Sequence, residues 1–168
     1  MNSLFRDDLK RTQSWVHLVA AVLLLSSAAP TLSAAENLRP NEATEKIGEP
    51  APGFDVRSLG GTDLRLADLK GKVVVLNFWF IACPPCRVEI PKLNQLVEEF
   101  READVVFIAF APDSEDDLRE FQETTAFEYH IIPNSTPVAE SFGVTGAPTH
   151  ILIDREGVIR SVRFGEVS

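Results

Sequence analysis

The clearest pattern in the chain is a short apolar run that gives way to a helical repeat. Residues 73–82 are apolar apart from Asn77 and begin with three valines, which is typical of a strand buried on both faces. Between residues 88 and 100, apolar side chains recur mostly three or four positions apart, as on one face of an amphipathic helix. The spacing therefore predicts a buried strand that leads directly into a helix.

Two cysteines, Cys83 and Cys86, lie at the junction between this strand and this helix. A thiol in that position meets the first N–H groups of the helix and the positive end of its dipole, and both favour the thiolate form. Because the thiolate is the form that attacks disulfides, the pair is a candidate for thiol–disulfide chemistry. Cys83 precedes the helix, so we expect it to be the more exposed, attacking thiol. Cys86 lies one turn further on and would resolve the mixed disulfide.

Shorter patterns predict the other elements, in the order β-hairpin followed by β-α-β-α-β-α-β-β. Strands that alternate with helices and end in a hairpin indicate an α/β protein with a mixed central sheet. Asp113 or Ser114 is expected to cap the helix that follows the strand at residues 104–110. The predicted strands are residues 54–56 and 64–66 of the hairpin, then 104–110, 127–132, 149–153 and 158–164, with a short helix at 138–142.

The N-terminal part of the chain has the character of an export segment. Residues 1–35 combine a basic start, a mostly apolar stretch and small residues before Glu36, so we expect a signal peptide or an uncleaved signal anchor. The apolar stretch, residues 15–25, is shorter than the roughly 20 residues that span a bilayer. Residues 36–47 are expected to form a linker, and residues 48–168 a single domain. Contact with a membrane is expected only if the N-terminal segment is not cleaved.

Composition excludes several other classes of protein. The net charge of −9 argues against binding to nucleic acid or to an anionic membrane through charge. Two cysteines this close together close almost no loop, so their disulfide adds little stability through chain entropy. No second cysteine pair is present, and His17, His130 and His150 show no ligand spacing, so we expect neither a metal nor another cofactor. His150 is expected to be an ordinary strand residue.

The segment from Asn77 to residue 96 resembles the active-site segment of the TlpA/ResA-like branch of the thioredoxin superfamily. The family pattern C-x-x-C-x-x-E-x-P is matched by Cys83, Cys86, Glu89 and Pro91, and a second segment, residues 144–154, is similar to the family's cis-proline strand. The resemblance covers residues 48–165. It implies a thioredoxin-like fold, in which a central mixed β-sheet is flanked by helices and an N-terminal β-hairpin is added.

The resemblance also implies roles for four further residues. Glu89 would lie beneath the thiols and influence their ionisation and proton transfer, since the family's glutamate does so. Pro148 would follow a cis peptide bond, and the backbone of Ala147 could pair with an extended client segment. Trp79 resembles a family aromatic beside the site, although a core aromatic explains it equally well.

Three features depart from the family. Ala82 stands where a tryptophan commonly precedes the first cysteine, so the groove beside Cys83 should be less aromatic. Asn77 stands where thioredoxin has a buried aspartate, which leaves Glu89 as the expected group for proton traffic. The sequence ends at Ser168 without the family's last helix, so we expect either that the sequence is a fragment or that one face of the sheet is less covered than usual.

The function that the resemblance implies is that of an envelope, or periplasmic, thiol–disulfide oxidoreductase, such as those of cytochrome c maturation. It would reduce disulfides of client proteins and receive electrons from a membrane thiol carrier. A peroxiredoxin shares the fold but needs Thr or Ser where Phe80 stands and Pro where Leu76 stands. A Sco-like copper protein is the non-enzyme alternative, but it needs C-x-x-x-C rather than the C-x-x-C found here.

Overall fold

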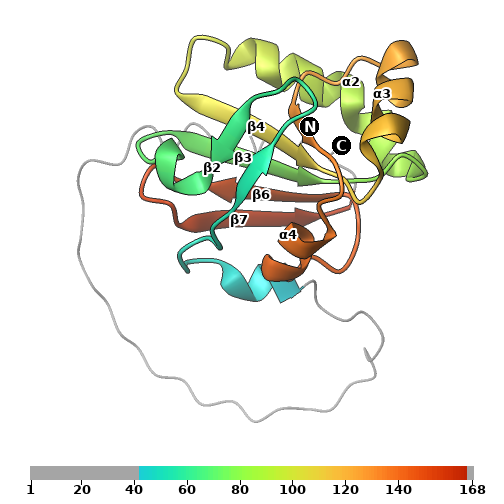
Figure 1. Ribbon diagram of the computed structural model, residues 1–168. Helices are drawn as coiled ribbons and strands as arrows, with labels where there is room; N and C mark the ends of the chain where they lie inside the picture. Colours follow the sequence, from blue (N-terminus) through green and yellow to red (C-terminus); the bar gives the residue numbers. More distant parts are fainter. Residues whose placement is uncertain (1–41, 166–168) are drawn as a thin grey trace, which may run out of the picture.

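The computed structural model describes residues 42–165, which are built around a five-stranded mixed β-sheet (Figure 1). The strand order is β5-β4-β3-β6-β7. The central strand β3 pairs in parallel with β4 and antiparallel with β6. The five strands are β3 (Val73–Phe78), β4 (Val105–Phe110), β5 (His130–Ile132), β6 (Thr149–Ile153) and β7 (Ile159–Phe164). The predicted mixed sheet is therefore confirmed.

Two layers of helices and turns cover the sheet. Helices α2 (Pro84–Glu99) and α3 (Glu115–Thr124) pack on one face, which we call the α2 face. The opposite face carries the predicted hairpin of β1 (Asp55–Arg57) and β2 (Asp63–Arg65), as well as three short helical elements. These are η1 (Glu42–Lys46), η2 (Leu66–Leu69) and α4 (Thr136–Ser141).

Strand β3 belongs to both layers because every one of its residues is buried. Its side chains alternate between the two faces, as the pleat requires. Val73 and Val75 enter the core beneath α2, whereas Val74 and Leu76 enter the opposite core. By the same alternation, Asn77 lies on the α2 face, since it is two residues beyond Val75.

The residues at the start of α2 favour the beginning of a helix. Cys83 is the N-cap residue and Pro84 and Pro85 fill the first two helical positions, where a missing N–H leaves no helical hydrogen bond unmade. The helix continues through Pro91 for 16 residues. Its buried residues lie on one stripe, which faces the sheet: Cys86, Glu89, Ile90, Leu93 and Leu96.

Three boundaries differ from the sequence prediction by three residues or more. The strand predicted for residues 127–132 forms sheet hydrogen bonds only over β5, because β4 offers partners only from Ile108 to Phe110. The central strand ends at Phe78 rather than at residue 82. The last part of the expected linker, residues 36–47, forms η1, which buries Ala43 completely against the domain.

Other N-terminal predictions, the export segment at residues 1–35 and the first part of the linker, lie outside the described residues. Among residues 42–165, no helix is both long and apolar enough to cross a membrane.

On the last two strands, β6 is buried along its whole length, and exposed side chains are confined to β7.

The contact between α4 and η1 predicts a sharp difference between two glycines. Gly143 and Gly157 both have a left-handed backbone, with φ of 69° and 84°. A β-carbon on Gly143 would lie 3.1 Å from backbone atoms of Glu42 and Ala43, whereas one on Gly157 would meet open space. Gly157→Ala should therefore lower the free energy of unfolding by about 1 kcal/mol, and Gly143→Ala by about 2–3 kcal/mol. Denaturant unfolding measures both, and equal losses would contradict this packing.

Candidate active site

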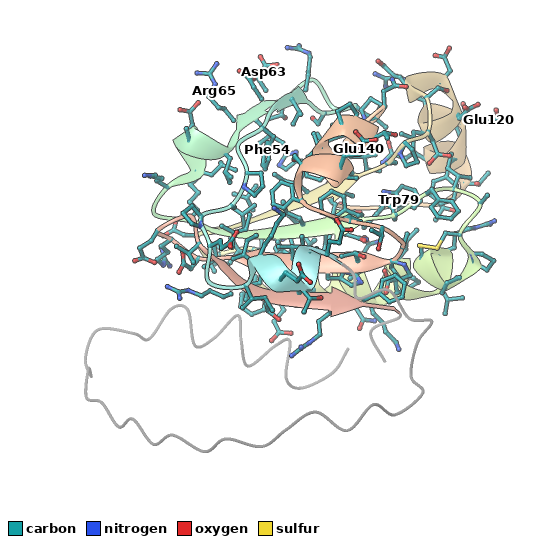
Figure 2. The ribbon with its side chains drawn as sticks, turned by 90° about the horizontal axis from the view of Figure 1, so that it is seen from below. Phe54, Asp63, Arg65, Trp79, Glu120 and Glu140 are labelled. Carbon is teal, nitrogen blue, oxygen red and sulfur yellow. A yellow bond between two sulfur atoms is a disulfide. The ribbon has the colours of Figure 1, made fainter. Side chains whose placement is uncertain are left out.

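Cys83 and Cys86 form a disulfide at the first turn of α2, with their Cα atoms 5.3 Å apart. Figure 2 shows it as a yellow bond at the end of that helix. The N–H of Cys86 donates a hydrogen bond to the Cys83 sulfur over 3.3 Å, so the sulfur acts as the helix cap. Both cysteines are buried in this oxidised form, with 2% of Cys83 and none of Cys86 exposed. We expected Cys83 to be the more exposed of the two, but in this form the difference in exposure is small.

One hydrogen bond within the loop and one to another segment fix the loop that carries Cys83. The N–H of Cys83 donates to the carbonyl of Phe80 over 3.1 Å, which closes a turn after β3. The N–H of Ile81 donates to the Asp113 carboxylate over 3.2 Å, which ties the loop to the start of α3. Ser114 caps α3, because its hydroxyl accepts a hydrogen bond from the N–H of Asp117. It is one of the two residues predicted as the cap. The loop before the disulfide is thus held from both sides.

The segment before β6 places the predicted cis proline at the same end of the sheet, because Thr149 pairs with Phe78 at the end of β3. The Ala147–Pro148 peptide bond is cis, as predicted. Ala147 is partly buried against the core cluster that contains both cysteines. The carbonyl of Pro148 accepts from the N–H of Gly165 over 2.9 Å, and this joins the segment to the end of β7. Pairing of the Ala147 backbone with a client stays a prediction.

A buried acid–imidazole pair lies beneath the α2 stripe. Nε2 of His150 lies 3.1 Å from Oε1 and 3.2 Å from Oε2 of Glu89, and neither side chain is exposed. Glu89 comes from α2, one turn after Cys86. His150 comes from β6, where it is paired in register with Asn77, so it also lies on the α2 face. The expectation that His150 is an ordinary strand residue was therefore wrong.

Tyr129 is a second residue of this site that the sequence did not indicate. Burial, and then the negative charge of Glu89, raise the pKa of Tyr129 well above its usual range. Its ring packs 5.1 Å from Phe107 and 4.9 Å from Phe127, between ring centroids. Among the described residues, neither the Tyr129 hydroxyl nor Oδ1 of Asn77 has a hydrogen-bond partner. The tyrosine therefore stays neutral and contributes polarity without charge.

Trp79 belongs to the core rather than to the surface. Only 1% of it is exposed, and its ring lies 5.3 Å from both Phe121 and Phe127, between centroids. Of the two interpretations that the sequence left open, the structure favours the core aromatic. A client chain on the surface would not reach its ring.

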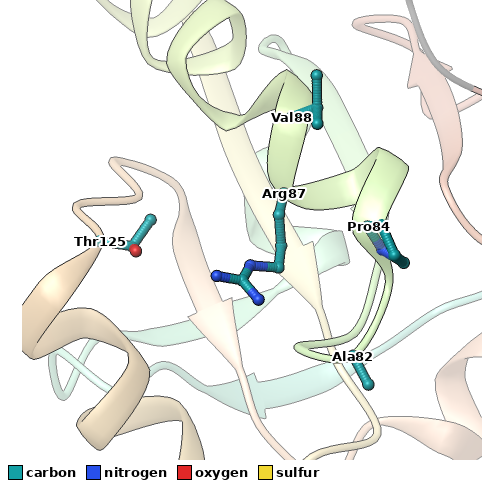
Figure 3. Close-up of a pocket in the computed structure, with 5 residues that line it drawn as sticks. All are labelled: Ala82, Pro84, Arg87, Val88 and Thr125. Atoms are coloured by element: carbon teal, nitrogen blue, oxygen red, sulfur yellow. The ribbon is translucent and has the colours of Figure 1, made fainter.

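A surface hollow of about 390 Å³ opens beside the disulfide (Figure 3). It is lined by Ala82, Pro84, Arg87, Val88 and Thr125. Arg87 extends across it from α2, with its guanidinium carbon 5.8 Å from the ring centroid of Phe121. The small side chain of Ala82 leaves this space open, which agrees with the expected loss of an aromatic there.

A second hollow, of about 520 Å³, shares Ala82 with the first and is acidic. Asp113, Asp117, Glu120 and Glu123 line it together with apolar side chains such as Phe121. Within residues 42–165, no three or more histidine, cysteine or acidic side chains are grouped so that they could hold a metal ion.

Comparisons with known proteins agree with this geometry. The AhpC/TSA family matches residues 47–162. "Thiol-disulfide oxidoreductase ResA" from Bacillus thuringiensis (strain Al Hakam) is 33% identical over 147 residues, which are 86% of this chain and 85% of that protein. "Thioredoxin-like protein YneN" from Bacillus subtilis (strain 168) is 34% identical over 72% of this chain and 73% of its own length.

Among solved structures, a similar one is described as a putative thiol:disulfide interchange protein DsbE from Chlorobium tepidum. Its TM-score is 0.67 at 29% identity, over 72% of this chain and 86% of that one. A cysteine pair at the start of a helix in a thioredoxin-like sheet defines a thiol–disulfide oxidoreductase, and this protein is an enzyme of that class. Its chain belongs to the AhpC/TSA family, and its relatives there are the ResA-like thiol–disulfide oxidoreductases.

The position of the two cysteines predicts different reactivities after reduction. Cys83 is flanked by exposed Ala82 and Pro84, whereas Cys86 faces the core from within α2. The Cys86→Ser variant, which keeps Cys83, should therefore be alkylated by iodoacetamide at least about tenfold faster at neutral pH than Cys83→Ser. Mass spectrometry at timed intervals measures both rates. Faster alkylation of the Cys83→Ser protein would reverse the two roles.

Proposed function

We propose that the protein reduces disulfides of exported client proteins through a cycle of the Cys83–Cys86 pair. The observation that carries this proposal is the disulfide at the first turn of α2, next to the cis-proline segment. The relatives with "thiol-disulfide oxidoreductase" in their names support the same class of reaction. The copper-binding and peroxidase alternatives are supported by neither the site nor these names.

The proposed cycle balances electrons and protons within two exchange steps. The Cys83 thiolate attacks a client disulfide, forms a mixed disulfide and releases the first client sulfur as a thiolate. The Cys86 thiol then loses its proton and attacks the Cys83 sulfur, which releases the second client sulfur. Two electrons pass to the client, whose thiolates take up two protons, and the Cys83–Cys86 disulfide is left.

The electrostatics of the helix start support reduction rather than oxidation of clients. A strong oxidant needs a strongly stabilised thiolate. Pro84 and Pro85 remove two N–H donors from the first turn, so that of the first three helical positions only Cys86 donates to the Cys83 sulfur. The carboxyl group of Glu89 adds negative charge one turn below. Both features disfavour a thiolate, and a less stable reduced form is the stronger reductant.

Exposed apolar side chains around the disulfide support docking of a protein client. Among the described residues, four large apolar side chains are exposed, and three of them lie in segments that form the site. Phe80 precedes the cysteine loop, and Val88 follows Cys86 on α2. Phe164 lies opposite Thr149 in register, and its ring contacts Gly146 beside the cis proline. The fourth, Ile47, follows η1 on the opposite layer.

We further infer that the protein works outside the cytoplasm and is recharged by a membrane thiol carrier. Residues 1–35 support export through their basic start, apolar stretch and small residues before Glu36. A disulfide reductase in an oxidising compartment needs electrons from across the membrane, which a membrane thiol carrier would supply. Mass spectrometry of the protein from an envelope fraction should find a terminus near Glu36 or an anchored intact chain. An intact, freely soluble cytoplasmic form would contradict this inference.

Replacement of Phe164 tests the proposed docking of a protein client. Phe164→Ala should slow the reduction of insulin disulfides about fivefold, because loss of partly buried aromatic area costs on the order of 1 kcal/mol. The small substrate hydroxyethyl disulfide should be reduced at an unchanged rate. Ile47→Ala is the matched control and should change neither rate.

Reduction is followed with dithiothreitol as the electron source. Equal effects of Phe164→Ala on both substrates would reject docking on this surface. A wild-type protein that accelerates neither reaction beyond dithiothreitol alone would reject the proposed function itself.

A further inference from the structure

Glu89 and His150 form a polar pair within the buried core of the molecule. Both side chains are fully buried, and the carboxylate contacts the imidazole through both of its oxygens at 3.1 and 3.2 Å. Burying an acid and a base together rarely adds stability, because the cost of removing both from water offsets their attraction. A role in the reaction explains why such a pair lies beneath the cysteines.

We propose that His150 positions Glu89 as the proton acceptor for the Cys86 thiol and takes up that proton in turn. The inference rests on the proposed reductase cycle, in which Cys86 must lose a proton before it attacks the Cys83 sulfur. Glu89 is three residues after Cys86 on the buried stripe of α2, so both lie on the same face of the helix. His150 holds the carboxyl group from the sheet side.

A lone buried carboxylate would accept this proton poorly as part of a repeated cycle. Without a partner, burial favours its neutral form, and it would already carry a proton when Cys86 needs to lose one. The imidazole of His150 stabilises the charged carboxylate by donating from Nε2. When the thiol proton arrives, the imidazole can carry it, since imidazole exchanges protons near neutral pH. The pair thus gains one proton without leaving an isolated charge in the core.

The other groups around the pair are consistent with this role. Tyr129, from the segment before β5, has a pKa raised by burial and by the charge of Glu89, so it stays neutral and does not compete for the proton. Asn77, beside His150 on β3, does not titrate. Arg163 lies opposite His150 on β7. Cys86, on the same buried stripe of α2 as Glu89, is the group whose proton this step moves.

When Cys86 resolves the mixed disulfide, one proton moves within the protein and the transfer of two electrons to the client is completed. Cys86–SH gives its proton to the Glu89–His150 pair and becomes the thiolate. This thiolate bonds to the Cys83 sulfur, the bond from Cys83 to the client sulfur breaks, and the client thiolate is protonated by water. When the electron donor reduces the disulfide again, the pair returns its proton to Cys86.

A two-phase reaction separates Cys86 from Cys83 in the full chain. Reduced protein mixed with 5,5′-dithiobis(2-nitrobenzoate) releases one coloured thiolate when Cys83 attacks and a second when Cys86 resolves the mixed disulfide. His150→Gln keeps a donor for Glu89 but cannot carry a proton. It should slow the second phase about tenfold at pH 7 and shift its pH profile upward, while the first phase stays within about twofold.

Three companion variants make the test specific. Glu89→Gln should slow the second phase by a similar factor, and the double variant should be no slower than Glu89→Gln, because the two residues act as one unit. His130→Gln replaces an exposed histidine on the edge strand β5; it is the control and should leave both phases unchanged. A second phase of wild-type rate and pH profile in His150→Gln would overturn the inference, as would additive effects in the double variant.

A measurement on the wild-type protein covers the case in which a substitution at this buried site perturbs the fold. In NMR titrations with labelled histidine, the His150 ring nitrogens should titrate differently in the reduced and oxidised proteins, whereas those of His130 should not. Identical His150 titrations in both redox states would overturn the inference. The proposed function would survive that result, since wild-type release of both coloured thiolates tests it independently.

Discussion

The burial of β3 on both faces is the constraint on which the rest of the structure depends. A strand whose six residues are all covered has to lie at the centre of the sheet, with β4 on one side and β6 on the other. Its end then fixes where the chain can leave the sheet, and α2 starts after only a short loop. The disulfide therefore lies at a rigid junction, and the cis-proline segment reaches it from the adjacent strand β6.

The same arrangement places a small polar group inside an apolar core. Alternation along β3 and β6 directs Asn77 and His150 to the α2 face, where Glu89 contacts His150. The surrounding side chains are largely aliphatic and aromatic, so each charge there interacts more strongly than it would at the surface. The proton transfer that we propose between this group and the thiols would act over one helical turn. On this account, the chain combines a structurally ordinary thioredoxin-like sheet with its own means of handling the proton of the resolving cysteine.

The sequence predicted the features that depend on the residues of a single segment. The buried strand, the helix after the cysteines and the cis proline could all be predicted, because local pattern and motif fix them. His150 could not be assigned in the same way, since its role depends on a residue 61 positions earlier on α2. Tyr129 was missed for a similar reason, because its effect comes from its proximity to Glu89 and not from its own segment. Helix η1 was not predicted because it is polar in sequence and Ala43 is the one buried residue among its five.

The reduction potential of the Cys83–Cys86 pair tests the central claim, that the protein is a reductant, most directly. Equilibration of the full chain with defined mixtures of reduced and oxidised glutathione gives this potential from the fraction of protein thiols. The account predicts a value closer to that of thioredoxin, about −270 mV, because the helix start stabilises a thiolate only weakly. A value near that of the oxidant DsbA, about −120 mV, would contradict it.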